Sequence, residues 1–161
     1  MRPASATWSF RENISPSALS VALDGKYSAV GTPNGLIFLN SRGRLLWYNK
    51  KIRKIKDVSV STISGKIAVG SSQKVLYLVN LKGESLWHRE LDSSVLAVSI
   101  SSRGNLIAVG TEEGRLMLFD GKGKKKWEVH LSNSDFSVNS VDITSDCLLY
   151  TSPSPRDWMV S

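Results

Sequence analysis

The fold is decided by the stretch Ala108-Val109-Gly110-Thr111-Glu112-Glu113-Gly114-Arg115-Leu116-Met117-Leu118-Phe119-Asp120, which is followed by Gly123 and Trp127. Shorter copies occur earlier: Ala29-Val30-Gly31-Thr32 precedes Gly43 and Trp47, and Ala68-Val69-Gly70-Ser71 precedes Gly83 and Trp87. The tryptophans Trp8, Trp47, Trp87 and Trp127 are separated by 39, 40 and 40 residues. Such a period indicates one supersecondary unit copied head to tail, in which each copy buries its apolar faces against its neighbours.

Each unit divides into four short runs of strand-forming residues. In the third unit these runs cover residues 95–100, 106–111, 115–119 and 125–131. The segments between the runs contain glycine, which adopts the positive φ that tight hairpin turns require. Four antiparallel strands joined by hairpins form one blade of a β-propeller. The sequence therefore predicts an all-β fold, a partial β-propeller of four-stranded antiparallel blades.

The repeat also predicts how the chain is divided. Three complete blades cover residues 15–54, 55–92 and 93–132, the outer strand of an incomplete blade covers 1–14, and the first strand of an interrupted blade covers 133–146. Propellers have four to eight blades, so three blades do not close a ring. We therefore expect a truncated fragment whose broken ends expose apolar faces and favour association.

The repeated glycines and tryptophans are predicted to be packing positions. Glycine in the second strand is expected where adjacent blades approach too closely for a side chain. Tryptophan on the fourth, outermost strand is expected to cover the seam between blades and to bury roughly 150–250 Å². A tryptophan that recurs in every blade is not expected to bind one cofactor. The structural repeat positions are Trp8, Trp47, Trp87, Trp127, Gly31, Gly70, Gly110, Gly43, Gly83 and Gly123.

The pattern Val109-Gly110-Thr111, Gly114, Leu116, Leu118-Phe119-Asp120, Gly123 and Trp127 resembles the PQQ-like (quinoprotein-type) β-propeller repeat and, more loosely, the WD repeat. The resemblance covers residues 8 to about 146. WD-repeat blades carry a Gly-His pair and end their third strand with Trp-Asp, whereas that strand ends here in Asn40, Asn80 or Asp120. The following turn is about one residue shorter than in quinoprotein dehydrogenases. The resemblance implies the fold, and family members range from dehydrogenases to scaffolds.

Composition excludes several classes of site. Cys147 is the only cysteine among 161 residues, so no intrachain disulfide and no thiolate metal cluster can form. No apolar run resembles a signal peptide or a membrane span. The localisation stays unknown, with the cytoplasm as the default expectation. The net charge of +7 makes an anionic partner worth considering.

The positive charge is concentrated in two places. The cations that could bind an anionic partner are Lys50, Lys51, Arg53, Lys54, Lys56, Lys124, Lys125 and Lys126. Together they could form a rim that holds a phosphate backbone or an acidic protein. The competing interpretation is an exposed strand and loop, in which Ile52 and Ile55 alternate with cations that discourage edge pairing. No aromatic stacking platform accompanies the charge, so nucleic acid is not the expected partner.

No catalytic, cofactor-binding or metal-binding residue is predicted. His88 and His130 follow their tryptophans at non-equivalent places, and metal binding needs converging ligands. Many acidic residues are expected at turns, where short carboxylates accept hydrogen bonds from the backbone; examples are Asp24, Asp92, Asp120, Asp142 and Asp146.

The predicted function is a non-catalytic propeller that acts as a protein-interaction scaffold, with no cofactor and with another protein as its partner. The alternative is the propeller portion of a PQQ-dependent quinoprotein dehydrogenase, or of a sensor or enzyme whose catalytic part lies outside this sequence. The sequence makes no prediction about a small-molecule ligand.

The pattern ends within the fourth unit. Residues 147–157 resemble one reading frame of a transposase-based sequencing adapter, so we expect residues 147–161, including Trp158, not to be native. The alternative is a genuine Pro-Ser-Pro tail. Codons unrelated to the adapter at positions 147–157 would exclude the first interpretation.

Overall fold

The structure is a computed structural model that describes residues 15–22, 24–131, 137–143 and 149–154. These residues form fourteen strands in three four-stranded antiparallel sheets and one two-stranded sheet. The all-β, partial propeller architecture expected from the sequence is confirmed. The strand expected over residues 1–14, which contains Trp8, lies outside the described residues, as do 144–148 and 155–161 of the region where the repeat ends.

Each four-stranded sheet pairs its strands in chain order. The first sheet contains β1 (Ala18–Val21), β2 (Tyr27–Thr32), β3 (Gly35–Asn40) and β4 (Leu45–Asn49). The second contains β5 (Ile55–Val60), β6 (Ile67–Ser71), β7 (Val75–Val79) and β8 (Ser85–Glu90). The third contains β9 (Val95–Ile100), β10 (Leu106–Thr111), β11 (Arg115–Asp120) and β12 (Lys125–His130), and β13 (Ser137–Ile143) pairs with β14 (Leu149–Ser154).

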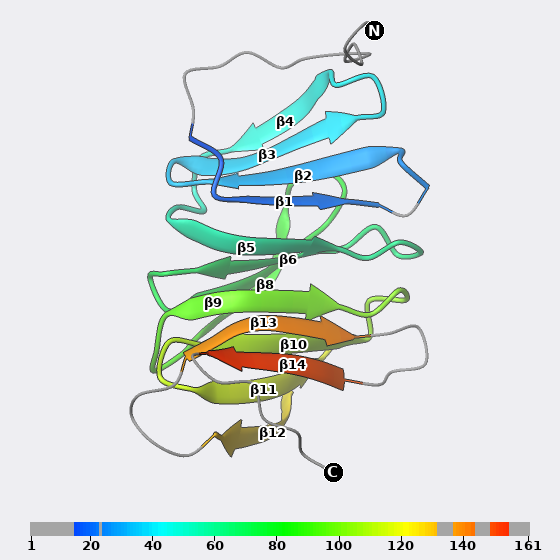
Figure 1. The fold of residues 1–161 in the computed structure, drawn as a ribbon. Coiled ribbons are helices and arrows are strands. Elements are labelled where there is room, and N and C mark those ends of the chain that lie inside the picture. Colours follow the sequence, from blue (N-terminus) through cyan, green and yellow to red (C-terminus); the bar gives the residue numbers. More distant parts are fainter. Residues whose placement is uncertain (1–14, 23, 132–136, 144–148, 155–161) are drawn as a thin grey trace, which may run out of the picture.

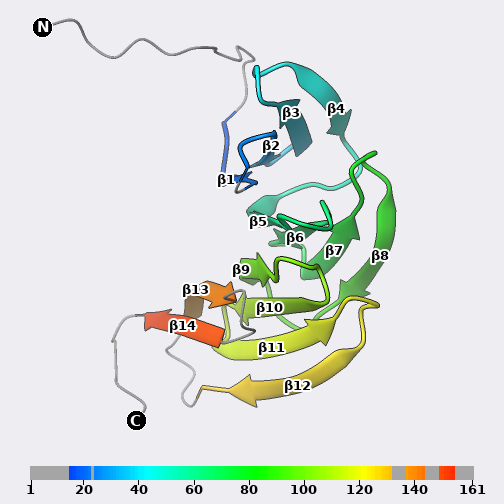
Figure 2. The ribbon, with the colours of Figure 1, turned by 90° about the vertical axis from the view of Figure 1, so that its right-hand side faces the viewer.

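The sheets are arranged as successive blades. They lie one above the other in Figure 1, and Figure 2 shows the strands β1, β5, β9 and β13 gathered along one side, with β4, β8 and β12 along the outer rim. The inner strands contact one another from blade to blade, β1 with β5, β5 with β9 and β9 with β13. We call the contact between the first and second sheets the first seam, and that between the second and third sheets the second seam.

Glycine in each second strand allows the inner edge of the next blade to approach. A methyl group added at Gly70 would overlap Val95 and lie 3.0 Å from Cγ1 of Val98. The same addition at Gly31 would overlap Ile55, and at Gly110 it would lie 2.8 Å from the backbone oxygen of Val138. These three glycines therefore lie at the closest approach between neighbouring blades.

Serine hydroxyls connect the inner strands across each seam. The Oγ of Ser59 on β5 accepts a hydrogen bond from the amide of Ile100 on β9, at 3.1 Å. Ser20 accepts in the same way from Val60, and Ser99 accepts from Ile143, both at 3.1 Å. Since a buried amide without a partner is costly, the recurring serine satisfies a donor that the sheet's own ladder does not reach.

The tryptophans of the outer strands dock on the turn of the next blade. The Nε1 of Trp47 donates to the carbonyl of Leu81 at 2.7 Å, and a methyl group added at Gly83 would lie 2.9 Å from its ring. The Nε1 of Trp87 donates to the carbonyl of Gly121 at 3.1 Å, and its ring lies against Gly123 in the same manner. The indole thus needs both a free carbonyl and a glycine on the neighbouring blade.

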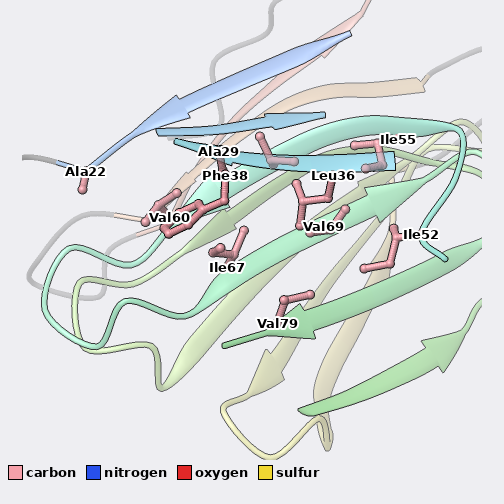
Figure 3. Close-up of a cluster of buried hydrophobic side chains, with 11 residues drawn as sticks. Ala22, Ala29, Leu36, Phe38, Ile52, Ile55, Val60, Ile67, Val69 and Val79 are labelled. Atoms are coloured by element: carbon pink, nitrogen blue, oxygen red, sulfur yellow. The ribbon is translucent and has the colours of Figure 1, made fainter. Parts of the chain in front are cut away.

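A continuous apolar core fills the first seam. Figure 3 shows Phe38 reaching toward Val60 and Ile67 of the second sheet. Phe38 also stacks with Tyr27 and Trp47 at ring-centroid separations of 5.3 and 4.9 Å. Because aromatic rings bury large areas and stack favourably, this column stabilises the face that the first sheet presents to the seam.

The turn before each tryptophan is organised by the residue that ends the third strand. The Oδ1 of Asn80 accepts from the amides of Lys82 and Glu84, both at 3.0 Å. Asn40 and Asp120 make the same pair of hydrogen bonds in their own blades. At Asp120 the hydrogen bonds from these amides hold the pKa of the carboxyl below its usual value. The glycines that follow, Gly43, Gly83 and Gly123, have φ of +73°, +85° and +84°.

Candidate functional site

The basic tract of residues 50–56 forms the connection from β4 to β5, at the left in Figure 1. The expectation of an exposed strand and loop is wrong for its apolar residues, because Ile52 and Ile55 are each 2% exposed. Both belong to the core of the first seam. Because the two isoleucines alternate with cations, the sequence suggested that they are exposed. In the structure the neighbouring sheet covers both of them.

The backbone of this connection is held by the adjacent hairpins. The amide of Lys54 donates to the carbonyl of Pro33 at 2.9 Å, and the carbonyl of Lys54 accepts from Ser72 at 2.9 Å. The Oγ of Ser71 donates to the carbonyl of Arg53 at 2.7 Å. The cations of the tract, Lys50, Lys51, Arg53, Lys54 and Lys56, are all exposed. These cations therefore project from a backbone segment that the adjacent hairpins hold in place.

The second group of cations, Lys124, Lys125 and Lys126, lies at the other end of the sheets. It follows the β11–β12 turn, where Gly121 lies against the β9–β10 turn, whereas residues 50–54 lie beside the β2–β3 and β6–β7 turns. In an antiparallel sheet these two sets of turns fall at opposite ends. The structure therefore does not bring the two groups into one rim, and Lys125 is paired with Glu128 at 2.7 Å.

A groove of about 760 Å³ runs along the first seam at the outer rim. We call it the seam groove. Its walls include the apolar or aromatic side chains of Trp47, Tyr48, Ile52, Tyr77 and His88. Its polar lining comes from Asn49, Lys50, Lys51, Lys82, Glu84 and Ser85. A concave, mostly apolar surface with a few polar groups is typical of a binding site.

Asn49 forms the floor of the seam groove. Its Nδ2 donates to the carbonyl of Gly83 at 3.0 Å, and its Oδ1 accepts from the amide of Lys51 at 2.9 Å. One short side chain thus links β4 to the turn of the second sheet and orients the start of the basic tract. The groove is consequently part of a fixed seam.

The charge of the seam groove is positive. Lys82 lies in the turn before β8, and Lys50 and Lys51 follow the end of β4, so three cations line the groove. The one carboxylate of its lining, Glu84, accepts a hydrogen bond from Asn80 at 2.9 Å. Burial, followed by the charge of Glu90, raises the pKa of Tyr77, so this phenol stays protonated and neutral.

The second seam has a longer side chain at the corresponding position. Arg89 occupies the position that corresponds to Asn49, and its Nε donates to the carbonyl of Gly123 at 2.8 Å. Its guanidinium also donates to the backbone carbonyl of Lys122 at 3.3 Å and lies 5.2 Å from the ring centroid of Trp87. Gly123 is buried, whereas Gly83 is only half-buried. At this position, therefore, the two seams differ in the length of the side chain.

The histidines lie apart from each other. His88 is exposed on β8 and lines the seam groove, whereas His130 ends β12 with its Nε2 at 3.0 Å from the carbonyl of Glu113. Within the described residues no group of three or more His, Cys, Asp or Glu side chains could hold a metal ion. No helix in this part of the chain is long and apolar enough to cross a membrane.

Asp57 is a half-buried carboxylate that the repeat pattern did not predict as a site. Its Oδ1 accepts from the amide of Val58 and its Oδ2 from the amide of Val98 on β9, both at 2.9 Å. Burial raises the pKa of this carboxyl, and the two hydrogen bonds oppose the shift. The sequence does distinguish this position, because the corresponding residues of the first and third blades are alanines, Ala18 and Ala97.

The stacked four-stranded sheets and the docked tryptophans define the chain as a segment of a repeat-built β-propeller of WD-repeat character. It belongs to the family described as the anaphase-promoting complex subunit 4 WD40 domain, whose model matches residues 65–146, half of the chain.

Structural comparison agrees with this fold. A solved structure of Kuenenia stuttgartiensis hydrazine synthase superposes with a TM-score of 0.71 at 14% sequence identity. The match covers 86% of this chain and 42% of that chain, so this chain spans less than half of its length. At such low identity the likeness shows the fold alone, and a fold shared by 1252 matching chains does not define a function. No protein with a curated function matches the sequence.

Proposed function

We propose that the chain is part of a non-catalytic β-propeller that serves as a protein-interaction scaffold, and that the seam groove is its binding surface. WD40 domains commonly mediate protein interactions, and the chain belongs to a WD40 family. The observation that carries the proposal is the contrast between the seams. A groove of about 760 Å³ lies beside Asn49, whereas Arg89, at the corresponding position of the next blade, donates to the turn that faces it.

The size and position of the seam groove suit a segment of polypeptide. It follows β4, an edge strand of five residues, which corresponds to about 16 Å of extended chain. Aromatic side chains and a cationic border give the apolar anchor and polar rim that are usual in protein interfaces. A site of this kind needs no reacting group, which supports a binding role rather than catalysis.

We also propose that the repeats are of the PQQ-like type within this propeller class. Support comes from the tryptophan on the fourth strand, which docks on a glycine and a carbonyl of the next blade at both Trp47 and Trp87. The third strand ends in Asn or Asp and organises the following turn, without the Trp-Asp pair of WD repeats.

A peptide selection tests the binding role. Random peptides displayed on phage are selected on the full chain, and each enriched peptide is then measured against the variant Asn49→Arg. The arginine is expected to copy the contacts of Arg89 and to fill the groove while preserving the fold. We expect enriched peptides to bind the variant at least about tenfold more weakly, a loss of about 1.4 kcal/mol.

The control is the reciprocal variant Arg89→Asn, which leaves the seam groove intact and is expected to keep the selected peptides bound. Circular dichroism and thermal melting establish that both variants fold. Enriched peptides that bind Asn49→Arg as tightly as the original chain would contradict the proposal.

A further inference from the structure

We infer that the seam groove recognises an extended acidic segment of a partner protein that carries an apolar side chain beside its carboxylates. The inference rests on the proposed function and adds the chemistry of the partner. It is drawn from the cations and the aromatic side chains that line the groove together.

Three cations line the groove from two elements. Lys82 stands in the turn before β8, and Lys50 and Lys51 stand where the chain leaves β4. The two elements meet there, since Asn49, the residue before Lys50, donates to the carbonyl of Gly83, the residue after Lys82. An acidic segment would place opposite charges beside these lysines, and complementary charge speeds association and fixes the register.

The groove also offers aromatic surface. Trp47, Tyr48 and Tyr77 line it and are each half-buried, whereas Ile52 is 2% exposed and adds almost no surface. An apolar side chain of the partner would displace water from this surface, where burial contributes about 25 cal/mol per Å². The lysines that border it then act in a less hydrated setting than lone surface charges.

The positive charge of the groove is only partly offset from within. Three lysines line it against one carboxylate, Glu84, whose oxygen accepts a hydrogen bond from Asn80 at 2.9 Å. Lys50 lies over the ring of Tyr48, 5.2 Å from its centroid, which orients the ammonium group without neutralising it. By contrast, Lys125 of the third sheet forms an ion pair with Glu128 at 2.7 Å. The first seam therefore offers unneutralised cations beside an apolar surface.

The aromatic rings favour a polypeptide over a nucleic acid. Trp47 lies against Gly83, Tyr48 lies under Lys50, and Tyr77 is tilted by 38° against His88. Binding of single strands relies on exposed ring faces on which successive bases stack. These rings are engaged by their own neighbours, so they form walls for a side chain.

Fluorescence anisotropy with defined ligands tests the inference. One ligand is a labelled nonapeptide with two glutamates at each end and a centre of valine, phenylalanine and leucine; its partner carries glutamine in place of every glutamate. We expect the acidic peptide to bind the full chain at least about tenfold more tightly at low salt. The difference should shrink at about 1 M salt, where the screening length is about 3 Å.

Charge reversal locates the effect. The double variant Lys50→Glu with Lys51→Glu is expected to weaken binding of the acidic peptide at least about tenfold and to leave the glutamine peptide unaffected. The matched control, Lys124→Glu with Lys126→Glu, makes the same change of charge at the other end of the sheets and should change neither. Equal losses in the two double variants would overturn the inference, since the effect would then follow net charge alone.

Other outcomes separate the inference from the proposed function. If both peptides bind equally well and both lose binding in Asn49→Arg, the acidic preference is overturned and the groove is still a protein-binding site. Tighter binding of a labelled single-stranded oligonucleotide than of the acidic peptide, lost in Lys50→Glu with Lys51→Glu, would overturn the inference in favour of a nucleic-acid partner. Absence of binding by either peptide would overturn it as well, while the phage selection still tests the scaffold role.

Discussion

Glycine at the middle of the second strand sets the distance between blades. At Gly70 the side chains of Val95 and Val98 occupy the space in which a Cβ would stand. Gly70 is not among the glycines that have a positive φ. Glycine is therefore required at this position for space and not for backbone conformation. Sequence analysis anticipated a close approach at this position, because glycine within a strand has few other uses.

The variant Gly70→Ala is expected to destabilise the chain by about 1–3 kcal/mol, the usual effect of overpacking a filled interior. Urea unfolding followed by tryptophan fluorescence measures the loss. Truncating the opposing side chain in the double variant Gly70→Ala with Val95→Ala should recover part of it, so that the double variant loses at least about 0.5 kcal/mol less than the sum of the single ones. Strict additivity would show that Val95 does not limit the space.

Strands and turns were predictable because each is specified by nearby residues. The runs expected at 95–100 and 106–111 coincide with β9 and β10, and glycine and Asn or Asp mark the turns between strands. The seam groove was not predictable in this way. It depends on the length of Asn49 against a turn 34 residues away, a contact that no local pattern encodes. The burial of Ile52 escaped the sequence for the same reason, since the covering residues belong to another sheet.

The third sheet also carries an ion-pair cluster between its outer two strands. Glu128 on β12 contacts Lys125 at 2.7 Å and Arg115 of β11 at 3.0 Å. Hydrogen bonds from these two cations, Lys125 first, lower the pKa of Glu128 below its ordinary value of 4.5. The folded state therefore holds the ionised form more firmly than the unfolded chain does. The stabilisation is complete well above pH 4.5 and is lost as the pH falls through the lowered pKa.

Replacing Glu128 by glutamine is expected to lower the free energy of unfolding at pH 7 by about 0.5 kcal/mol, a value suited to a largely solvated ion pair. As the pH falls below the lowered pKa, the difference from the original chain should disappear, because the carboxyl becomes protonated in both states. Urea titrations between pH 3 and pH 8 measure it, with Glu112→Gln, an exposed position outside the cluster, as control. A difference that persists undiminished at low pH would assign the effect to packing.

The stack of sheets leaves one inner strand open to solvent. On β1, Leu19 and Val21 are 65% and 53% exposed, whereas Val58 and Val60, the corresponding residues of β5, are 4% and 7% exposed. In the second sheet these positions are covered by the preceding blade. The same apolar face is thus a buried seam in one blade and a surface in another, and exposed apolar patches promote association.

We expect the full chain to self-associate in a concentration-dependent manner, and the double variant Leu19→Thr with Val21→Thr to shift it toward monomer. Threonine keeps the β-branched shape that strands favour while removing apolar surface. Size-exclusion chromatography with light scattering should show association at least about tenfold weaker, since each buried large apolar side chain contributes roughly 1.5–3 kcal/mol. Ile63→Thr, at a turn residue that is 71% exposed, serves as control. A chain that is monomeric at all concentrations before mutation would contradict this expectation.

The docking of each indole on the glycine of the following blade has a further consequence for ancestry. Trp47 meets Gly83 and Trp87 meets Gly123, an offset of 36 residues in both cases. Gain or loss of one whole unit in the gene leaves every remaining tryptophan opposite a glycine, so no new interface has to arise. Lineages of such chains can therefore change their number of blades by recombination between repeats, while each surviving seam keeps the geometry it already had.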